Sequence, residues 1–322
     1  MKCINNTKKT KLLCILCIAA LFMTGCGTQT AEIQNPYSLT GDNSSVSSQL
    51  FAHNLCVTDD VNFGNDQVDS KYAEGAGVFD LTSKEVLYSQ NLFKKLYPAS
   101  TTKILTAYII IRNCNMDDQV TVSADAVANM ADSSKCGLAA GDVLTVKDLL
   151  YGLLLVSGND AANVLAEHYS GSIDQFAEEM NKEAAALGAT NSHFVNANGL
   201  PDDDHYTTVY DMYLIFQAAI QLQDFVDIIH SASYDVSYQN ASGNTVSTTW
   251  QNTNQYLNGI TKVPDDITVI GGKTGTTNAA GYCLVLYSKN KKGDDIVSIV
   301  YKGNTRYEMY SLMNEILSTF AN

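Results

Sequence analysis

The hydrophobic pattern gives a strand hairpin, a block of helices, a block of strands and a final helix, and this order constrains the fold more than any other feature. Residues 75–80 and 85–88 alternate as a hairpin around a polar turn. A short strand at 119–122 and an apolar helix at 104–111 precede a block of helical periodicity at 146–156, 161–169, 173–187, 207–220 and 223–229. The last block holds strands at 234–238, 267–270, 282–287 and 296–301, and a helix at 307–320.

This order predicts an α+β fold in which strands from both ends of the chain form one antiparallel sheet. Helices would flank the sheet, and an all-helical lobe would be inserted between the two blocks of strands. With 322 residues the chain is long enough for one large domain or two modest ones. A binding site would lie in the groove between sheet and lobe.

The first 25 residues have the composition of an export signal. An apolar run at 12–23 is short for a transmembrane helix and typical of a signal-peptide core. It follows a basic segment that contains Lys2, Lys8, Lys9 and Lys11. The run ends in Met-Thr-Gly-Cys at 23–26, which resembles the lipobox of bacterial lipoproteins, although Met23 departs from the usual leucine.

We therefore expect cleavage after residue 25 and a lipid on Cys26. A polar stretch after the cysteine predicts a flexible tether over 26–70, with the folded domain over 71–322. The protein would be exported and held by its lipid at the outer face of a bacterial membrane. An ordinary signal peptide with a chance cysteine is the alternative.

The charge balance argues against nucleic-acid binding. The whole chain carries −14, and residues 1–25 contain four lysines and no acidic residue, so the remainder is more negative still. Such a surface repels phosphate backbones and anionic lipid headgroups. Membrane attachment would therefore depend on acyl chains.

The spacing of cysteines and histidines gives no indication of a metal or cofactor. The four cysteines beyond Cys26 are far apart and form no Cys-x-x-Cys pair: Cys56, Cys114, Cys136 and Cys283. We expect them to be free thiols. The five histidines form no His-x-x-x-His or His-Glu-x-x-His pair, so we expect no metal site.

The first chemical motif reads Pro-Ala-Ser-Thr-Thr-Lys at 98–103, just before the apolar helix. Pro98 fixes the chain ahead of the helix, and Ser100 or Thr101 is expected to cap it. Ser100 and Lys103 would then lie one turn apart on the same face. A hydroxyl at a helix start beside an amine is a candidate activated nucleophile.

Two further motifs present polar side chains at turns and at a sheet edge. Ser157 and Asn159 flank a glycine between two predicted helices. Gly-Gly-Lys-Thr-Gly-Thr-Thr at 271–277 enters a predicted strand and lacks the spacing of a phosphate loop. On a sheet edge its glycines would let a substrate backbone approach, while Lys273 and Thr274 offer a cation and a hydroxyl.

Ser-x-x-Lys, Ser-Gly-Asn and Lys-Thr-Gly in this order resemble the signature of penicillin-binding proteins and class A β-lactamases. The chain is most similar to the low-molecular-mass D-alanyl-D-alanine carboxypeptidases, a serine peptidase family that uses Ser-Gly-Asn. Similar stretches occur at 149–167, 176–187, 194–200, 205–214 and 252–254, so the resemblance covers roughly residues 70–320. It implies a β-lactamase/transpeptidase-like fold and no cofactor.

The resemblance implies acyl transfer through an ester on Ser100. Lys103 would accept the serine proton, with its pKa depressed by Lys273. Ser157 would relay a proton to the departing D-alanine, and Asn159 would hold the substrate amide.

The remaining roles implied by the resemblance concern the two ends of the reacting peptide. Lys273, Thr274, Gly275 and Thr276 would face the terminal carboxylate, together with Arg306 at the start of the last helix. The oxyanion hole would use the backbone N–H groups of Ser100 and Thr276. The substrates would be peptidoglycan stem peptides, with β-lactams as covalent inhibitors.

Three alternatives remain open at this point. Class A β-lactamases need a glutamate in Glu-x-x-Leu-Asn to activate water, and the comparable region, Ser-His-Phe-Val-Asn at 192–196, has none. The closest match, Glu-Glu-Met-Asn at 178–181, lies in a predicted helix, so we expect slow turnover of penicillin. A transpeptidase carries the same motifs, and a non-catalytic surface lipoprotein that binds peptidoglycan is the alternative outside enzymes.

Related carboxypeptidases often carry a β domain and an amphipathic membrane helix after the catalytic domain. This chain ends at Asn322, soon after its last predicted helix, so we expect neither. The lipid on Cys26 would do the anchoring in their place.

Overall fold

The computed structural model describes residue 52, residues 54–128 and residues 133–322. The lipobox, Cys26 and the first half of the predicted tether lie outside the described residues.

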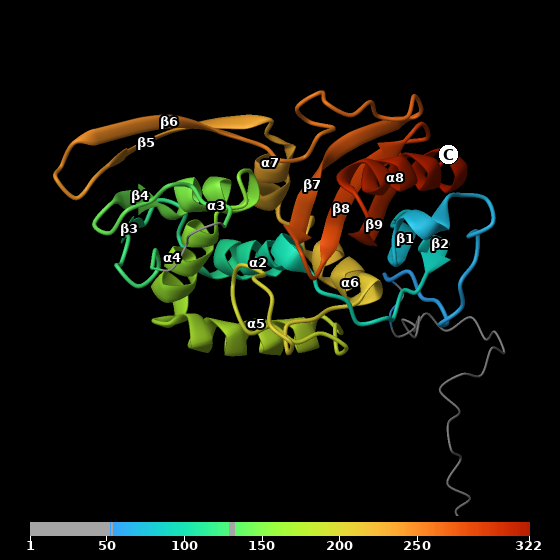
Figure 1. The fold of residues 1–322 in the computed structure, drawn as a ribbon, viewed down its shortest axis with the longest axis horizontal. Coiled ribbons are helices and arrows are strands. Elements are labelled where there is room, and N and C mark those ends of the chain that lie inside the picture. Colours follow the sequence, from blue (N-terminus) through green and yellow to red (C-terminus); the bar gives the residue numbers. More distant parts are fainter. Residues whose placement is uncertain (1–51, 53, 129–132) are drawn as a thin grey trace, which may run out of the picture. The chain divides into compact units, whose positions relative to one another are not determined.

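The centre of the domain is a five-stranded antiparallel sheet with the strand order β2-β1-β9-β8-β7 (Figure 1). β1 (Gly75–Asp80) pairs with β2 (Glu85–Gln90) on one side and with β9 (Asp295–Gly303) on the other. β8 (Gly281–Asn290) and β7 (Ile267–Thr277) complete the sheet, and β7 is an edge strand. The prediction that strands from both ends of the chain share one sheet is confirmed.

Helices cover both faces of this sheet, because its strands are apolar on both sides. Val300 of β9 packs with α8 (Arg306–Phe320) on one face. Ile299, its neighbour in sequence, points to the opposite face and packs in the core that contains α6 (Val209–Ala219). The flanking helices and the α+β class agree with the prediction.

Most helices begin where the sequence indicates, at threonine or serine caps. The remaining helices are α2 (Lys103–Asn113), α3 (Val146–Leu154), α4 (Asn159–Ser170), α5 (Ile173–Ala186) and α7 (Gln223–His230). The side chains that accept a first-turn N–H are Thr145, Ser172, Thr208 and Thr305. Among the described residues no single helix is long and apolar enough to span a membrane; α6 and α7 reach that length only as a pair bent by 107°.

The inserted lobe is not all-helical, which corrects the prediction. It contains a four-stranded sheet in the order β3-β4-β5-β6, made of β3 (Gln119–Thr121), β4 (Val143–Thr145), β5 (Ser233–Gln239) and β6 (Thr245–Gln251). β5 pairs in this sheet because its aromatic face packs on the lobe: the ring of Tyr234 stacks on Tyr151 of α3 at 3.7 Å. β6 was not predicted, because Trp250 is its only buried side chain and one apolar residue is too few to give an alternating pattern.

The folded domain begins before residue 71, so the tether prediction was wrong for residues 54–70. Cys56 is 0% exposed, and its backbone N–H donates to the hydroxyl of Tyr213 at 2.8 Å. Phe63 pairs with Ser89 of β2 through an isolated bridge. A few apolar side chains are enough to pack this polar segment against the domain, and the polar composition of the segment does not indicate them.

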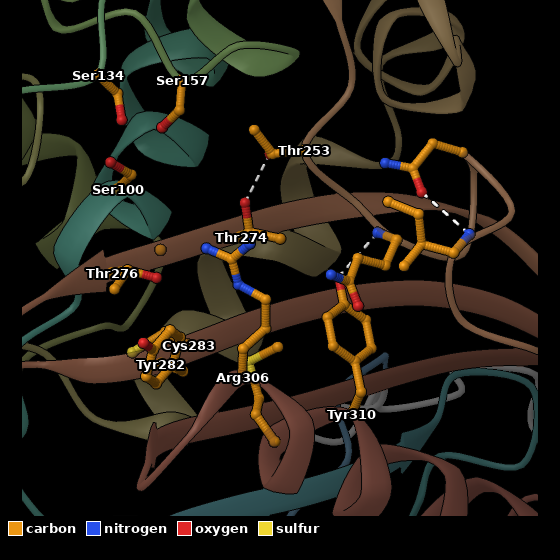
Figure 2. A pocket seen from close by; sticks show the side chains of 15 residues that line it. Ser100, Ser134, Ser157, Thr253, Thr274, Thr276, Tyr282, Cys283, Arg306 and Tyr310 are labelled. Carbon is orange, nitrogen blue, oxygen red and sulfur yellow. Dashed lines mark hydrogen bonds between the residues drawn. The ribbon is translucent and has the colours of Figure 1, made fainter.

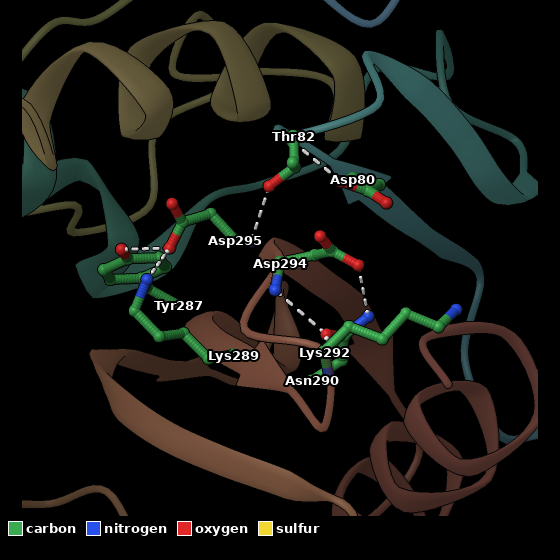
Figure 3. Close-up of polar contacts among 8 residues, drawn as sticks. All are labelled: Asp80, Thr82, Tyr287, Lys289, Asn290, Lys292, Asp294 and Asp295. Atoms are coloured by element: carbon green, nitrogen blue, oxygen red, sulfur yellow. Dashed lines mark hydrogen bonds and ion pairs between the residues drawn. The ribbon is translucent and has the colours of Figure 1, made fainter.

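Polar contacts fasten the β8–β9 turn to the β1–β2 turn at one end of the sheet (Figure 3). Asn290 Oδ1 accepts the N–H of Asp294 at 2.9 Å and so closes the tight turn. The carboxylate of Asp295 accepts from the Tyr287 hydroxyl at 2.6 Å, and its N–H donates to Thr82 Oγ1 at 3.0 Å. These contacts fix the register of the strands that lead to the site.

The thiol prediction is confirmed: the four cysteines of the described part are free. Within the described ranges, no group of three or more His, Cys, Asp or Glu side chains is arranged to hold a metal ion.

Candidate active site

Ser100 lies in a 3-10 turn, Ala99–Thr102, that leads directly into α2. The predicted serine or threonine cap was wrong, because the turn continues into the helix and the N-cap residue, Thr102, makes no side-chain cap bond. Thr101 instead donates to the carbonyl of Pro98 at 2.7 Å. Ala99 has φ 48°, a strained conformation for a residue with a side chain. The turn leaves the Ser100 hydroxyl free for chemistry.

Lys103 is 0% exposed and makes three short contacts through Nζ. They are with Ser100 Oγ at 3.0 Å, Asn159 Oδ1 at 2.6 Å and the carbonyl of Asn198 at 2.6 Å. Burial, and secondarily the charge of Lys273, lowers the pKa of Lys103 well below its usual value. The sequence named the neighbouring cation as the cause, whereas burial is the larger one.

The contacts of Lys103 determine what a neutral amine does here. A neutral amine has two N–H bonds and one lone pair, and the Asn159 amide oxygen and the Asn198 carbonyl can only accept. The two N–H groups therefore point at these oxygens, and the lone pair faces Ser100. In that state the serine hydroxyl donates to Lys103, which is the geometry of a nucleophile and its base.

Ser157 and Lys273 form a second pair, next to the first. Ser157 lies in the turn between α3 and α4 with φ 65°, another strained position. Lys273 Nζ donates to Ser157 Oγ at 3.0 Å and to the carbonyl of Thr274 at 2.9 Å. Burial lowers the pKa of Lys273 to about 7. This lysine lies within the edge strand β7 and is 1% exposed.

The resemblance implied that Asn159 holds the substrate amide, and the structure adds a contact with Lys103. Asn159 Oδ1 accepts from Lys103 Nζ and so holds the lysine amine in place. Its side chain also lines a cavity beside Ser100, where a substrate amide can reach it.

Two cavities meet at Ser100 and Thr276. One, of about 280 Å³, runs from Ser100 and Ser157 along β7 to Arg306 (Figure 2). The other, of about 490 Å³, extends along the opposite side, past Asn159 and Leu200. None of the described residues that line either cavity is acidic.

The first cavity is built to receive an anion at its far end. In Figure 2 the guanidinium of the exposed Arg306 lies on the Thr274 side of the cavity, away from the hydroxyls of Ser100, Ser134 and Ser157. Thr276 also lines this cavity. The arrangement places an arginine fork and hydroxyls where a carboxylate can be bound.

β7 passes directly against the turn that carries Ser100. A Cβ on Gly275 would lie 3.0 Å from the backbone nitrogen of Ser100, closer than side chains normally approach. Glycine therefore lets the edge strand and the serine backbone meet around one point.

A family model for D-alanyl-D-alanine carboxypeptidases (peptidase S11) matches residues 63–305. The chain belongs to this family.

Several relatives and solved structures agree with the assignment. The D-alanyl-D-alanine carboxypeptidase DacF of Bacillus subtilis is 32% identical over 252 residues, which are 76% of this chain and 61% of DacF. The D-alanyl-D-alanine carboxypeptidase of Streptomyces sp. strain K15 is 34% identical over 227 residues, 66% of this chain and 75% of the relative. The crystal structure of the Streptomyces K15 DD-transpeptidase matches with a TM-score of 0.71 and 29% identity, covering 77% of this chain and 96% of that one.

The chain spans about three fifths of the length of DacF, and 57% of DacA of Haemophilus influenzae, to which it is 32% identical over 240 residues, 70% of this chain. The structural match to the DD-transpeptidase supports the β-lactamase/transpeptidase-like fold that the motifs implied.

The structure adds residues that the motifs of this carboxypeptidase family did not single out. Asn198 offers a backbone carbonyl to Lys103, and its side chain donates to Asn163 Oδ1 at 3.0 Å. Gly199 has φ 87°, and a Cβ there would lie 1.8 Å from the carbonyl oxygen of Ala99. A backbone carbonyl has no sequence signature; the stretch 194–200 was noted as similar to the family, without any role for Asn198.

Proposed function

We propose that the chain is a serine-type D-Ala-D-Ala carboxypeptidase that removes the terminal D-alanine from peptidoglycan stem pentapeptides through an acyl-serine intermediate. The observation that carries the proposal is the 3.0 Å contact of Ser100 Oγ with Lys103 Nζ, whose other two contacts are acceptors only. Family membership and the names of the relatives support the substrate class.

Acylation begins with attack of Ser100 Oγ on the carbonyl carbon between the two D-alanines. The hydroxyl proton passes to Lys103, whose neutral form has a free lone pair. Ser157 gives its proton to the nitrogen of the departing D-alanine, and Lys273, 3.0 Å away, holds Ser157 in place. The proton on Lys103 then passes to Ser157 and restores its hydroxyl. The net result is the transfer of one proton from Ser100 to the leaving D-alanine.

The charge that develops on the carbonyl oxygen would be stabilised by the backbone N–H groups of Ser100 and Thr276. Each such donor lowers the barrier by about 3–4 kcal/mol. The terminal carboxylate would bind Thr274, Thr276 and Arg306 at the far end of the first cavity, where a bidentate arginine fork fits it. The preceding stem residues would lie in the second cavity, with Asn159 near their amide.

The site favours a carboxypeptidase over a β-lactamase. The described lining residues include no carboxylate that could activate water against a penicilloyl ester. We therefore expect penicillin to acylate Ser100 readily and the resulting penicilloyl ester to be hydrolysed slowly. Hydrolysis of penicillin at many turnovers per second by the purified protein would contradict this.

Transpeptidation is the second candidate, because one of the structural neighbours is named a DD-transpeptidase. Both reactions share the acyl-enzyme and differ in whether water or an amine accepts it. Mass spectrometry of a pentapeptide substrate separates them: loss of one alanine indicates the carboxypeptidase, and a cross-linked product indicates the transpeptidase.

The test of the proposed function is Ser100→Ala. We expect the variant to lose D-alanine release and covalent labelling by penicillin while keeping its fold, as judged by circular dichroism. Retained labelling would show that Ser100 is not the nucleophile. A folded wild-type protein without labelling or alanine release would favour the non-catalytic peptidoglycan-binding lipoprotein.

We further propose that the protein is exported and held at the outer face of the cell membrane by a lipid on Cys26. The basic segment, the apolar run and Met-Thr-Gly-Cys at 23–26 support this. Cys26→Ala should move the protein from the membrane fraction to the soluble fraction of cells, because the residue that would carry the lipid is removed. If the variant stays with the membrane as the wild type does, the anchor is not at Cys26.

A further inference from the structure

Thr253 contributes a hydroxyl to the first cavity, although no motif includes it among the catalytic groups. In Figure 2 it lies between Ser157 and Thr274, and its hydroxyl contacts that of Thr274. The two oxygens, Thr253 Oγ1 and Thr274 Oγ1, are 2.7 Å apart. Thr274 is the residue to which the proposed function assigns contact with the substrate carboxylate.

The loop that carries Thr253 is held rigidly although Thr253 itself is exposed. Its neighbours Asn252 and Asn254 are buried, and Asn252 Oδ1 accepts the N–H of Asn254 at 2.9 Å. The N–H of Thr253 donates to the carbonyl of Leu155, just before the Ser157 turn, at 3.0 Å. The hydroxyl is therefore presented by a fixed backbone that joins the Ser157 turn to β7.

The direction of the hydroxyl–hydroxyl bond follows from the number of protons. Each threonine hydroxyl has one proton to donate, and a carboxylate can only accept. If Thr274 donated to Thr253, it would turn lone pairs toward the substrate carboxylate, which is repulsive. A bound carboxylate thus selects the opposite direction, in which Thr253 donates to Thr274 and Thr274 donates to the carboxylate.

We propose that Thr253 is a positioning residue, whose hydroxyl fixes Thr274 as a donor to the terminal carboxylate of the substrate. The inference rests on the proposed function for the identity of the substrate. The two hydroxyls form a short chain in which each bond polarises the next. Thr253 acts on binding of the free carboxyl end and takes no part in the proton transfers at Ser100.

The experiment compares Thr253→Val, which removes the hydroxyl and keeps the shape, with Thr253→Ser, which keeps the hydroxyl. We expect Thr253→Val to raise KM for a pentapeptide substrate by about three- to tenfold, the effect of one hydrogen bond, with kcat within about twofold of the wild type. Thr253→Ser should restore the wild-type KM. Thr249→Val is the matched control, because Thr249 is also exposed and hydrogen-bonded, to Asp235 on the β5–β6 hairpin.

A binding measurement separates this inference from the catalytic proposal. In the Ser100→Ala background, calorimetry with the pentapeptide and with its C-terminal amide measures affinity without turnover. We expect Thr253→Val to weaken binding of the carboxylate peptide by about three- to tenfold and binding of the amide less, since an amide N–H can donate to Thr274. Failure of the wild type to release D-alanine would refute the proposed function, while the calorimetry would still decide the role of Thr253.

Equal losses for the two peptides, an unchanged affinity, or a Thr253→Ser variant as weak as Thr253→Val would each overturn the role of Thr253. A lower thermal midpoint in Thr253→Val with an unchanged ratio of carboxylate to amide affinity would show a merely structural role.

Discussion

Lys103 and Lys273 are both buried amines, yet their contacts give them different tasks. Lys103 contacts two oxygens that can only accept and one serine hydroxyl that can donate, so its neutral form is placed to act as the base of the proposed reaction. Lys273 donates to the Ser157 hydroxyl and to the carbonyl of Thr274, and both of these residues line the first cavity. Burial lowers the pKa of both lysines. A lower pKa favours the neutral amine that a base requires, and it disfavours the charged amine that attracts an anion.

These shifts predict two opposite effects of pH on kcat/KM. Loss of the proton from Lys103, whose pKa burial lowers well below its usual value, increases kcat/KM. The falling limb, near pH 7, reflects loss of the charge of Lys273, whose pKa is about 7. A bound carboxylate favours charged Lys273 and raises its pKa, so the falling limb of kcat should lie at higher pH than that of kcat/KM.

Steady-state kinetics between about pH 5 and 10 check this prediction, with Lys273→Arg as the control. Arginine stays charged over this range, so the falling limb should disappear in the variant if it retains activity. A falling limb at the same pH in the variant would assign it to another group.

At the scale of elements, the site depends on the loop at 196–200 being pressed against the Ser100 turn. Gly199 allows this approach, since a Cβ there would collide with backbone atoms of Ala99 and its φ of 87° suits glycine. The adjacent Asn198 carbonyl accepts from Lys103, so the contact between loop and turn also sets the position of the base.

Gly199→Ala should therefore reduce the rate of penicillin acylation by about tenfold or more, in line with other displaced catalytic groups, and destabilise the fold by about 1–3 kcal/mol. Gly243→Ala is the matched control, with φ 76° and no heavy atom near the added Cβ. Stopped-flow acylation and urea unfolding measure the two effects. Equal acylation rates for the two variants would show that the loop contact does not position Lys103.

The sequence predicted elements whose residues carry a local pattern and missed those that depend on distant partners. Ser100, Ser157 and Lys273 each belong to a short motif, so a helix start, a turn and a sheet edge could be foreseen for them, although Ser100 lies in the 3-10 turn ahead of the helix. The carbonyl of Asn198 and the hydroxyl of Thr253 act through contacts that no local pattern encodes. β6 and the packed segment at 54–70 were missed because their few buried side chains are surrounded by polar ones.

At the scale of the whole molecule, the buried lysines make stability depend on pH. Lys103 and Lys273 have a lower pKa in the folded chain than in the unfolded chain. At a pH between the folded and the unfolded pKa of a lysine, the unfolded chain therefore binds more protons than the folded chain. The free energy of unfolding should therefore rise with pH from about 7 to about 8, below the range in which the cysteine thiols titrate, by up to about 1.4 kcal/mol per pH unit for one proton.

Urea unfolding at three pH values in this range tests the rise. In Lys273→Met the contribution of that residue disappears, so the dependence on pH should be shallower than in the wild type. A wild type whose stability falls over this range would contradict the proton balance.

The position of β1 between β2 and β9 has a consequence for the order of assembly. Val78 of β1 pairs with Ser298 of β9, so the sheet cannot close until the last tenth of the sequence has been synthesised. Tyr301 of the same strand reaches the nucleophile turn, where its hydroxyl contacts Thr101 at 2.5 Å. Pairing between such distant segments slows folding. We therefore expect a nascent chain that lacks β9 to be unable to react with penicillin.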